Sequence, residues 1–320
     1  MRILRAIFAA TLLAASATAA SSQDKPKIGL TYIVEHPAID AVRDGILEGL
    51  AKAGYKDGET ASIVIRSAQG NMATQAQIAN EFSGLDLDLA IAISTPSAQA
   101  LKNALKDEPL LFAAVTDPVG AGLIASMAQP GGNVTGTSDR QSFEPTLQLI
   151  RKMLPEAKRI GVIFNPGEAN SVSQVEALKA AVVPYGMEVV DGPAAQSTLV
   201  GDAARSLVGR VDAILLPTDS TVVSVVESIV TVGKKARLPV FASDTGSAER
   251  GALAALGFNY FDMGKMTAEM AVKILKGENP DAIPAAVPAG QDIYLNLPSA
   301  KAMGVDIPHD LRSAAKKVIE

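Results

Sequence analysis

Apolar, β-branched segments alternate along this chain with segments whose apolar residues recur at steps of three and four. Residues 27–33 form an apolar run, and residues 37–53 carry Ile39, Val42 and Ile46 on one face of a helical period. Short apolar runs predict strands, and the longer period predicts amphipathic helices. In the first 140 residues we predict strands at 27–33, 61–67, 87–94, 110–116 and 134–137 and helices at 37–53, 71–82 and 97–105.

The same alternation starts again after residue 140. Here we predict helices at 143–154, 171–183, 198–207, 221–235 and 263–276 and strands at 159–165, 187–190, 212–216, 239–243 and 253–258. We expect the last of these strands to close a second sheet, the Ala/Pro stretch 280–289 to be a linker, and the tail to hold a strand at 293–297 before short helices. Two successive series of strand–helix units predict an α/β fold of two doubly wound lobes with mostly parallel sheets.

The first residues have the order of parts of a secretory signal peptide. Arg2 and Arg5 precede a run at 6–15 that is apolar except for Thr11, and residues 17–19 have the small-x-small form of a cleavage site. We therefore expect residues 1–19 to be removed and the mature protein to be soluble in the periplasm. An uncleaved membrane anchor is the alternative. The sequence has no Cys, which excludes a lipid-modified Cys at the cleavage point.

Composition and charge narrow the classes of function. The net charge is -5 and no long basic run occurs, which argues against a nucleic-acid partner. The two histidines, His36 and His309, are isolated, so no metal site is expected, and His36 is interpreted as a helix-start residue. Neither a G-x-S-x-G nor a P-loop motif occurs. We therefore predict no catalytic residue and no cofactor. The sequence does not exclude catalysis by a pair of carboxylates, but no motif indicates it.

The residues that follow each predicted strand are candidate ligand contacts, because ligands bind beyond the carboxyl ends of strands in open parallel sheets. The turn at 94–98 has the clearest mechanism. Pro96 suits the first helical position, and Thr95 would then be the N-cap. The N–H groups of Ser97 and Ala98 would face an anion, such as a ligand carboxylate, at the positive end of the helix dipole. An ordinary capped helix without a ligand is equally compatible with this turn.

Four aspartates also follow predicted strands, namely Asp117, Asp139, Asp219 and Asp244. A carboxylate at such a position can hold a ligand ammonium through charge-assisted hydrogen bonds. Each can instead cap a helix or close a turn, and Asp219 fits a cap well because it precedes the predicted helix 221–235. We expect at least one of the four to contact a ligand.

These strand ends resemble those of a known family. The stretches are EHPA at 35–38, AISTPSAQ at 92–99, AVTDPVGAGL at 114–123, NVTGTSD at 133–139, NPGEANS at 165–171, SD at 243–244 and ERGA at 249–252. They resemble the periplasmic substrate-binding proteins of ABC importers that have the type I periplasmic-binding-protein fold. Some members of that family bind aromatic amino acids. The resemblance covers nearly the whole chain after the signal segment.

The resemblance implies two lobes that close on a ligand and are joined by three crossovers, which we place near residues 139–142, 257–261 and 288–292. The N-terminal lobe would hold residues 27–139 plus 261–288, and the C-terminal lobe residues 140–260 plus 289–320. Ligand contacts would come from both lobes. The expected contacts are Glu35, Ser94, Thr95, Ser97, Ala98, Thr116, Asp117, Ser138, Asp139, Asn170, Ser171, Asp219, Ser243, Asp244, Phe258 and Tyr260.

The predicted function is the solute-binding component of an ABC importer, acting as a monomer with a small-molecule ligand and a permease in the inner membrane. A ligand-sensing periplasmic protein is the alternative, and a secreted hydrolase is a third class. Sugar sites stack aromatic faces on the ring, and the absence of Trp disfavours a sugar. An amino acid, aromatic in some family members, needs one anion site and one cation site, which the strand ends supply. Phe258 and Tyr260 would line its side-chain pocket or pack in the hinge.

Overall fold

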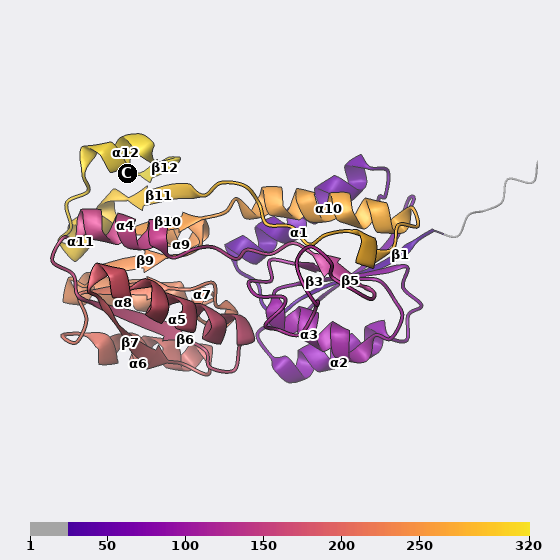
Figure 1. Ribbon diagram of the computed structural model, residues 1–320, viewed down its shortest axis with the longest axis horizontal. Coiled ribbons are helices and arrows are strands. Elements are labelled where there is room, and N and C mark those ends of the chain that lie inside the picture. Colours follow the sequence, from indigo (N-terminus) through magenta and orange to yellow (C-terminus); the bar gives the residue numbers. More distant parts are fainter. Residues whose placement is uncertain (1–24) are drawn as a thin grey trace, which may run out of the picture.

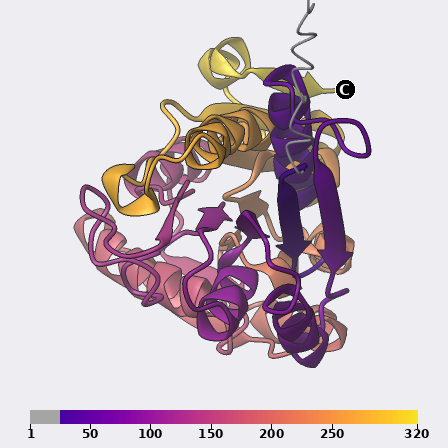
Figure 2. The same ribbon diagram turned by 90° about the vertical axis from the view of Figure 1, so that its right-hand side faces the viewer.

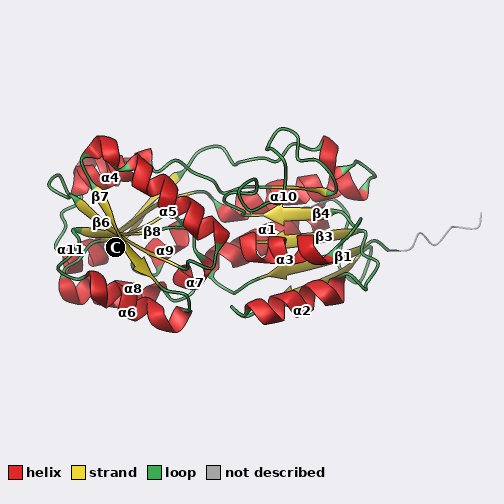
Figure 3. Ribbon diagram, turned by 60° about the horizontal axis from the view of Figure 1, so that its bottom comes forward, coloured by secondary structure: helices red, strands yellow, loops and turns green. Residues whose placement is uncertain are grey.

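The computed structural model describes residues 25–320 as an α/β protein with two separate sheets (Figure 1). The predicted signal segment 1–19 lies outside the described residues. Helices lie on both faces of each sheet, as Figure 3 shows. The prediction of two doubly wound, mostly parallel lobes is therefore confirmed. Among residues 25–320, no helix combines the length and apolar character needed to cross a lipid bilayer.

The first lobe contains a five-stranded sheet in the order β2-β1-β3-β4-β5, in which all pairs are parallel. Its strands are short, and apart from the partly exposed edge strand β2 their central residues are buried, as expected for a sheet covered on both faces. The strands are β1 (Lys27–Tyr32), β2 (Ser62–Ser67), β3 (Leu89–Ile93), β4 (Leu110–Ala113) and β5 (Val134–Gly136). Its helices are α1 (Pro37–Lys52), α2 (Met72–Phe82), α3 (Thr95–Ala104) and α10 (Tyr260–Leu275).

The second lobe contains a seven-stranded sheet in the order β12-β11-β10-β9-β8-β6-β7. Its strands are β6 (Arg159–Phe164), β7 (Glu188–Pro193), β8 (Ala213–Leu216), β9 (Val240–Ala242), β10 (Ala254–Gly257), β11 (Asp292–Asn296) and β12 (Lys317–Ile319). Its α-helices are α4 (Glu144–Met153), α5 (Ala169–Ala181), α6 (Val200–Leu207), α7 (Ser220–Val223), α8 (Val226–Ala236), α9 (Thr245–Glu249), α11 (Leu297–Met303) and α12 (His309–Ala314). Single 3-10 turns are η1 (Val183–Tyr185) and η2 (Ser197–Leu199), and η3 (Pro280–Ala282) lies on the first lobe.

Three predictions about the second half of the chain are wrong. The strand predicted at 253–258 does not close the sheet, because β11 pairs antiparallel with β10 and β12 pairs with β11. The helix predicted at 221–235 is two helices, since Val225 has non-helical dihedral angles (φ -128°, ψ 32°). The stretch 280–289 is not a free linker. The carbonyl of Ile283 accepts the Thr135 hydroxyl at 2.7 Å, and Ala286 forms a parallel bridge with Thr137.

The chain passes between the lobes three times, before α4, before α10 and before β11 (Figure 1). The second passage returns α10 to the first lobe, where it packs against α1 on one side of the sheet while α2 and α3 cover the other side (Figure 2). The backbones of α1 and α10 approach each other closely at Gly45 and Gly264. A Cβ on Gly264 would lie 2.2 Å from the Val42 carbonyl oxygen, so the two backbones touch there. This contact brings Tyr260, the first residue of α10, close to the start of α1.

Candidate functional site

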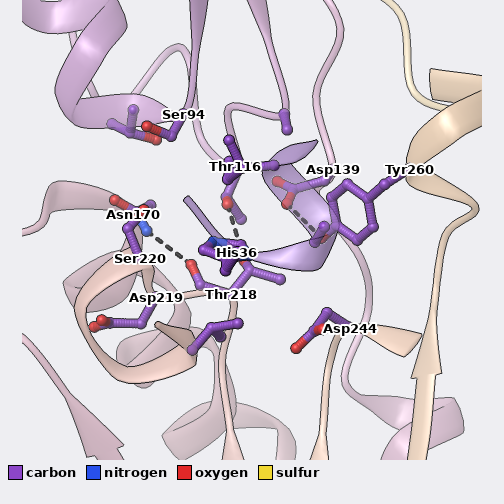
Figure 4. A pocket seen from close by; sticks show the side chains of 15 residues that line it. His36, Ser94, Thr116, Asp139, Asn170, Thr218, Asp219, Ser220, Asp244 and Tyr260 are labelled. Atoms are coloured by element: carbon purple, nitrogen blue, oxygen red, sulfur yellow. Dashed lines mark hydrogen bonds between the residues drawn. The ribbon is translucent and has the colours of Figure 1, made fainter. Parts of the chain in front are cut away.

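A pocket lies between the lobes, where the carboxyl ends of the strands of both sheets face each other (Figure 4). The empty space within it, part of which is open to solvent, amounts to about 380 Å³. The first lobe contributes residues from the starts of α1 and α3, and the second lobe contributes residues from the starts of α5 and α7. The lining residues are His36, Ala38, Ile39, Ser94, Thr95, Ala114, Thr116, Asp139, Asn170, Thr218, Asp219, Ser220, Val223, Asp244 and Tyr260.

The two lobes are in direct contact across the cleft. The hydroxyls of Thr116 and Thr218 lie 3.2 Å apart, and the Ser173 hydroxyl donates to Asp117 Oδ2 at 2.7 Å. In the first crossover, Gln141 Nε2 donates to the Ser243 carbonyl at 2.9 Å. Each of the first two contacts joins a residue of the first lobe to one of the second. The cleft is therefore closed over the pocket in this structure.

The start of α3 presents two hydroxyls to the pocket. Ser94 is the N-cap and has φ +80°, and the neighbouring lining residue Ala114 has φ +52°. Such angles are uncommon for residues other than glycine, and they cluster at functional sites. The hydroxyl oxygens of Ser94 and Thr95 are buried and find no hydrogen-bond partner within residues 25–320. Both hydroxyls are therefore available to a ligand at the positive end of a helix.

The structure corrects the predicted cap and one of the predicted donors of this turn. Thr95 is the first residue of α3, so the N-cap is Ser94 and not Thr95. The N–H group of Ala98 donates to the Ser94 carbonyl at 3.1 Å and is not free for an anion. The Ser97 hydroxyl donates to Gln75 Oε1 at 3.0 Å, while the Ser97 N–H group, the other predicted donor, has no acceptor among residues 25–320. The donors that the turn offers are thus the hydroxyls of its first two residues and the N–H group of Ser97.

Asp139 has one carboxylate oxygen in use and one that is free. The Tyr260 hydroxyl donates to Oδ2 at 2.9 Å, while Oδ1 is buried without a partner in the described chain. Burial raises the pKa of this carboxyl above its usual value. An ionised carboxylate in such a position needs a cationic partner, so Asp139 is the candidate to hold a ligand ammonium.

Asp219 and Asp244 also line the pocket, but their oxygens bond to their own lobe. Asp219 accepts the N–H of Val222 at 2.8 Å as the N-cap of α7, and its other oxygen accepts the N–H of Asn165 and the Ser171 hydroxyl, both at 2.6 Å. Asp244 accepts the N–H and the hydroxyl of Ser247 at 2.9 and 2.6 Å as the N-cap of α9. Capping, which the sequence left open for both residues, is therefore the role that these bonds support.

We expect Asp219 to make the protein less stable as pH rises toward neutrality. Burial, and then the charge of Glu168, raises the pKa of Asp219 to about 7. Between about pH 4, the ordinary pKa of Asp, and pH 7 the folded state binds more protons at Asp219 than the unfolded state does, so the free energy of unfolding falls with rising pH. Asp219→Asn, which also caps a helix, should give a shallower slope in urea unfolding from pH 4.5 to 8. An identical slope in both proteins would contradict this assignment.

Two other lining side chains have unused polar atoms. Asn170 Nδ2 donates to the Thr218 carbonyl at 2.8 Å, while its Oδ1 is buried and has no partner within the described residues. His36 precedes α1, and its Nδ1 is buried and unpartnered in the same part of the chain. Burial, and then the positive charge of Arg250, lowers the pKa of His36 to about 3. The imidazole is therefore neutral near pH 7.

The structure gathers half of the predicted contacts around the pocket and places the others outside its lining. Those in the lining are Ser94, Thr95, Thr116, Asp139, Asn170, Asp219, Asp244 and Tyr260. Those outside are Glu35, Ser97, Ala98, Asp117, Ser138, Ser171, Ser243 and Phe258. Glu35 is exposed, and the hydroxyl of Ser138 donates to the Thr116 carbonyl at 3.2 Å. Asp117 bonds to Ser173 at the edge of the cleft and holds the lobes together there.

Seven lining residues were not predicted: His36, Ala38, Ile39, Ala114, Thr218, Ser220 and Val223. His36, Thr218 and Ser220 are immediate neighbours of predicted residues, so a wider window at each strand end would have included them. Nothing in the sequence distinguishes Val223, which is the last residue of the short helix α7. Among residues 25–320, no group of three His, Asp or Glu side chains is arranged to hold a metal ion.

Two doubly wound lobes that close on a polar pocket lined by the starts of helices are the architecture of a type I periplasmic binding protein. Structures with this architecture include a solute-binding protein from Bacillus halodurans with bound myo-inositol, at 16% identity and a TM-score of 0.61, covering 88% of this chain and 96% of that one. Residues 27–319 match the family of ABC transporter substrate binding proteins. The chain belongs to this family, whose members bind small molecules and work with ABC permeases.

Two relatives are much more similar. The tyrosine-binding protein of Clostridioides difficile is 41% identical over 282 residues, which are 88% of this chain and 82% of the relative. The crystal structure of an ABC domain in complex with L-Trp from Streptococcus pneumonia is 34% identical, with a TM-score of 0.89 over 92% of this chain and all (100%) of that chain.

A third comparison bears on the closed cleft. The ligand-free, open structure of a substrate-binding protein with adhesive properties from Clostridium difficile is 43% identical, covering 92% of this chain and 99% of that one. Its TM-score is only 0.70, against 0.89 for the less similar L-Trp complex. A lower score at higher identity is expected when the lobes of one protein are open and those of the other are closed.

Proposed function

We propose that this protein captures a free aromatic amino acid in the periplasm and delivers it to the permease of an ABC importer in the inner membrane. The observation that carries the proposal is the free, buried oxygen of Asp139 in the same closed pocket as the free hydroxyls of Ser94 and Thr95. In Figure 4, Asp139 and Ser94 lie on opposite sides of Thr116. One acceptor and a pair of donors at a helix start are what a zwitterion requires.

The rest of the lining supports an amino acid with an apolar body. Ala38, Ile39 and Ala114 from the first lobe and Val223 from the second provide apolar surface beside the polar groups. A sugar site would stack aromatic faces on the ring. Tyr260 is the lining residue with a phenol ring, and its hydroxyl is bonded to Asp139. The tyrosine-binding relative and the L-Trp complex support an aromatic amino acid over a small aliphatic one.

The test is calorimetric titration of purified protein, freed of ligand by unfolding and refolding, with L-tyrosine, L-tryptophan and two derivatives of each. We expect the free amino acids to bind with micromolar or tighter affinity. The α-amide removes the carboxylate and the N-acetyl derivative removes the ammonium. Each should bind at least about tenfold more weakly, since a hydrogen bond to a charged group contributes about 1.5–3 kcal/mol.

Glucose serves as the control ligand and should give no heat of binding. Equal binding of the amide and the free acid would rule out the carboxylate site, and equal binding of the N-acetyl derivative would rule out the ammonium site. Recovery of the ligand unchanged after incubation supports a binding protein over a hydrolase. A permease and an ATPase encoded beside this chain support an importer over a sensor. We also propose that the protein acts as a monomer and needs neither a nucleic-acid partner nor a cofactor.

A further inference from the structure

His36 lines the pocket but has no part in the proposed binding of the ligand's carboxylate and ammonium groups. The residue is 9% exposed, and its Nδ1 has no hydrogen-bond partner within residues 25–320. A buried polar atom without a partner is costly, so one in a pocket marks a place where a ligand atom completes the bond. Ser94, Thr95 and Asp139 already account for the two charged ends of an amino acid.

The surroundings of His36 indicate which part of the ligand it faces. Ala38 and Ile39, two of the apolar lining residues, follow it directly at the start of α1. Val223, another apolar lining residue, lies next to Ser224 in the chain. The Ser224 carbonyl accepts a hydrogen bond from Arg250, and the positive charge of Arg250 also lowers the pKa of His36. His36 is therefore a polar lining residue that directly precedes apolar lining residues at the start of α1. In Figure 4 the ring lies among the lining side chains and not at their edge.

The protonation state of the ring limits what it can recognise. Because burial and Arg250 keep the imidazole neutral near pH 7, it has one N–H donor and one nitrogen acceptor. A neutral ring can bond to a phenol hydroxyl or to an indole N–H. The imidazole forms no such hydrogen bond with a phenyl ring, which would leave its buried nitrogen without a partner.

Resting on the proposed function, we propose that His36 selects aromatic amino acids whose side chain carries a hydrogen-bonding group and discriminates against phenylalanine. Leaving a buried polar atom unsatisfied costs about 1–3 kcal/mol, which corresponds to a factor of about 5 to 150 in affinity. We therefore expect the wild-type protein to bind L-tyrosine and L-tryptophan at least about tenfold more tightly than L-phenylalanine.

The experiment compares the affinities of the three amino acids for wild type and for His36→Leu, His36→Asn and the control His309→Asn. In His36→Leu the preference for tyrosine over phenylalanine should fall to within about threefold, while phenylalanine binds as well as before, because only the polar contact is lost. His36→Asn should retain part of the preference, and Asn suits the N-cap position of α1. His309 is exposed and distant in sequence, so its replacement should change nothing.

A measurement on the wild-type protein does not depend on any variant folding. The chain has two histidines, so the ring nitrogens of His36 can be assigned in NMR spectra by comparison with His309→Asn. Tyrosine should shift the His36 ring signals and phenylalanine should shift them much less. Equal affinities of all three ligands for wild type, or an unchanged preference in His36→Leu, would overturn the role of His36 alone. Failure of all three to bind would overturn the proposed function and this inference with it.

Discussion

Asp139→Asn should weaken the binding of L-tyrosine or L-tryptophan by about 10- to 150-fold, the range expected from losing a charge-assisted hydrogen bond of about 1.5–3 kcal/mol. Its Oδ1 is the buried carboxylate oxygen of the pocket that no group of the described chain satisfies. Asn has nearly the same shape but no charge, so it leaves the ligand ammonium poorly compensated. Calorimetric titration of both proteins with the same amino acid measures the loss.

Stability separates this role from a structural one. An acid whose pKa is raised by folding lowers the free energy of unfolding when it ionises. Ligand-free Asp139→Asn protein should therefore be at least as stable as ligand-free wild type at pH 8. Asp244→Asn is the comparison within the pocket and should change affinity much less, because both of its oxygens bond to Ser247. Asp212→Asn, at the amino ends of β6 and β8, is the control outside the pocket. If Asp139→Asn binds like wild type while Asp219→Asn or Asp244→Asn does not, the ammonium site lies in the second lobe.

Gly264→Ala should destabilise the protein by about 3 kcal/mol, at the upper end of the usual cost of overpacking. A Cβ at this position would lie 2.2 Å from the Val42 carbonyl oxygen and 2.9 Å from Gly45 Cα, so α1 and α10 would have to separate. In an ordinary helix interior the same replacement is stabilising by about 0.5–1 kcal/mol, so the expected sign is the reverse of the intrinsic preference. The measurement is urea unfolding of the ligand-free protein.

The matched control is Gly84→Ala, where an added Cβ would meet nothing closer than the Glu81 carbonyl oxygen at 3.6 Å. It should leave stability nearly unchanged. Because α1 begins after His36 and α10 begins at Tyr260, we also expect Gly264→Ala to weaken ligand binding, since both residues line the pocket. Wild-type stability in Gly264→Ala would show that the two helices are not in backbone contact.

Local sequence signals were reliable where one element decides its own geometry. The apolar run at 27–33 and the helical period at 37–53 correspond to β1 and α1 within one residue at each end. Residues 94–98 were correctly placed at a helix start, although the cap lies one residue earlier, because Ser94 adopts a positive φ that no propensity predicts. The split between α7 and α8 was missed because residues 221–235 have a continuous helical pattern.

The sequence by itself determined the two series of strand–helix units and the polar residues at the ends of their strands, because periodicity and strand-end composition are local properties. It also narrowed the candidates for the proposed ammonium site to four aspartates that follow strands. Only the tertiary structure distinguishes these aspartates by their hydrogen bonds. Asp219 and Asp244 bond to groups of their own lobe, whereas Asp139 meets Tyr260 from a helix that begins more than a hundred residues later and keeps one oxygen free. Whether a carboxylate is satisfied depends on which distant segments fold against it, and no local pattern contains that information.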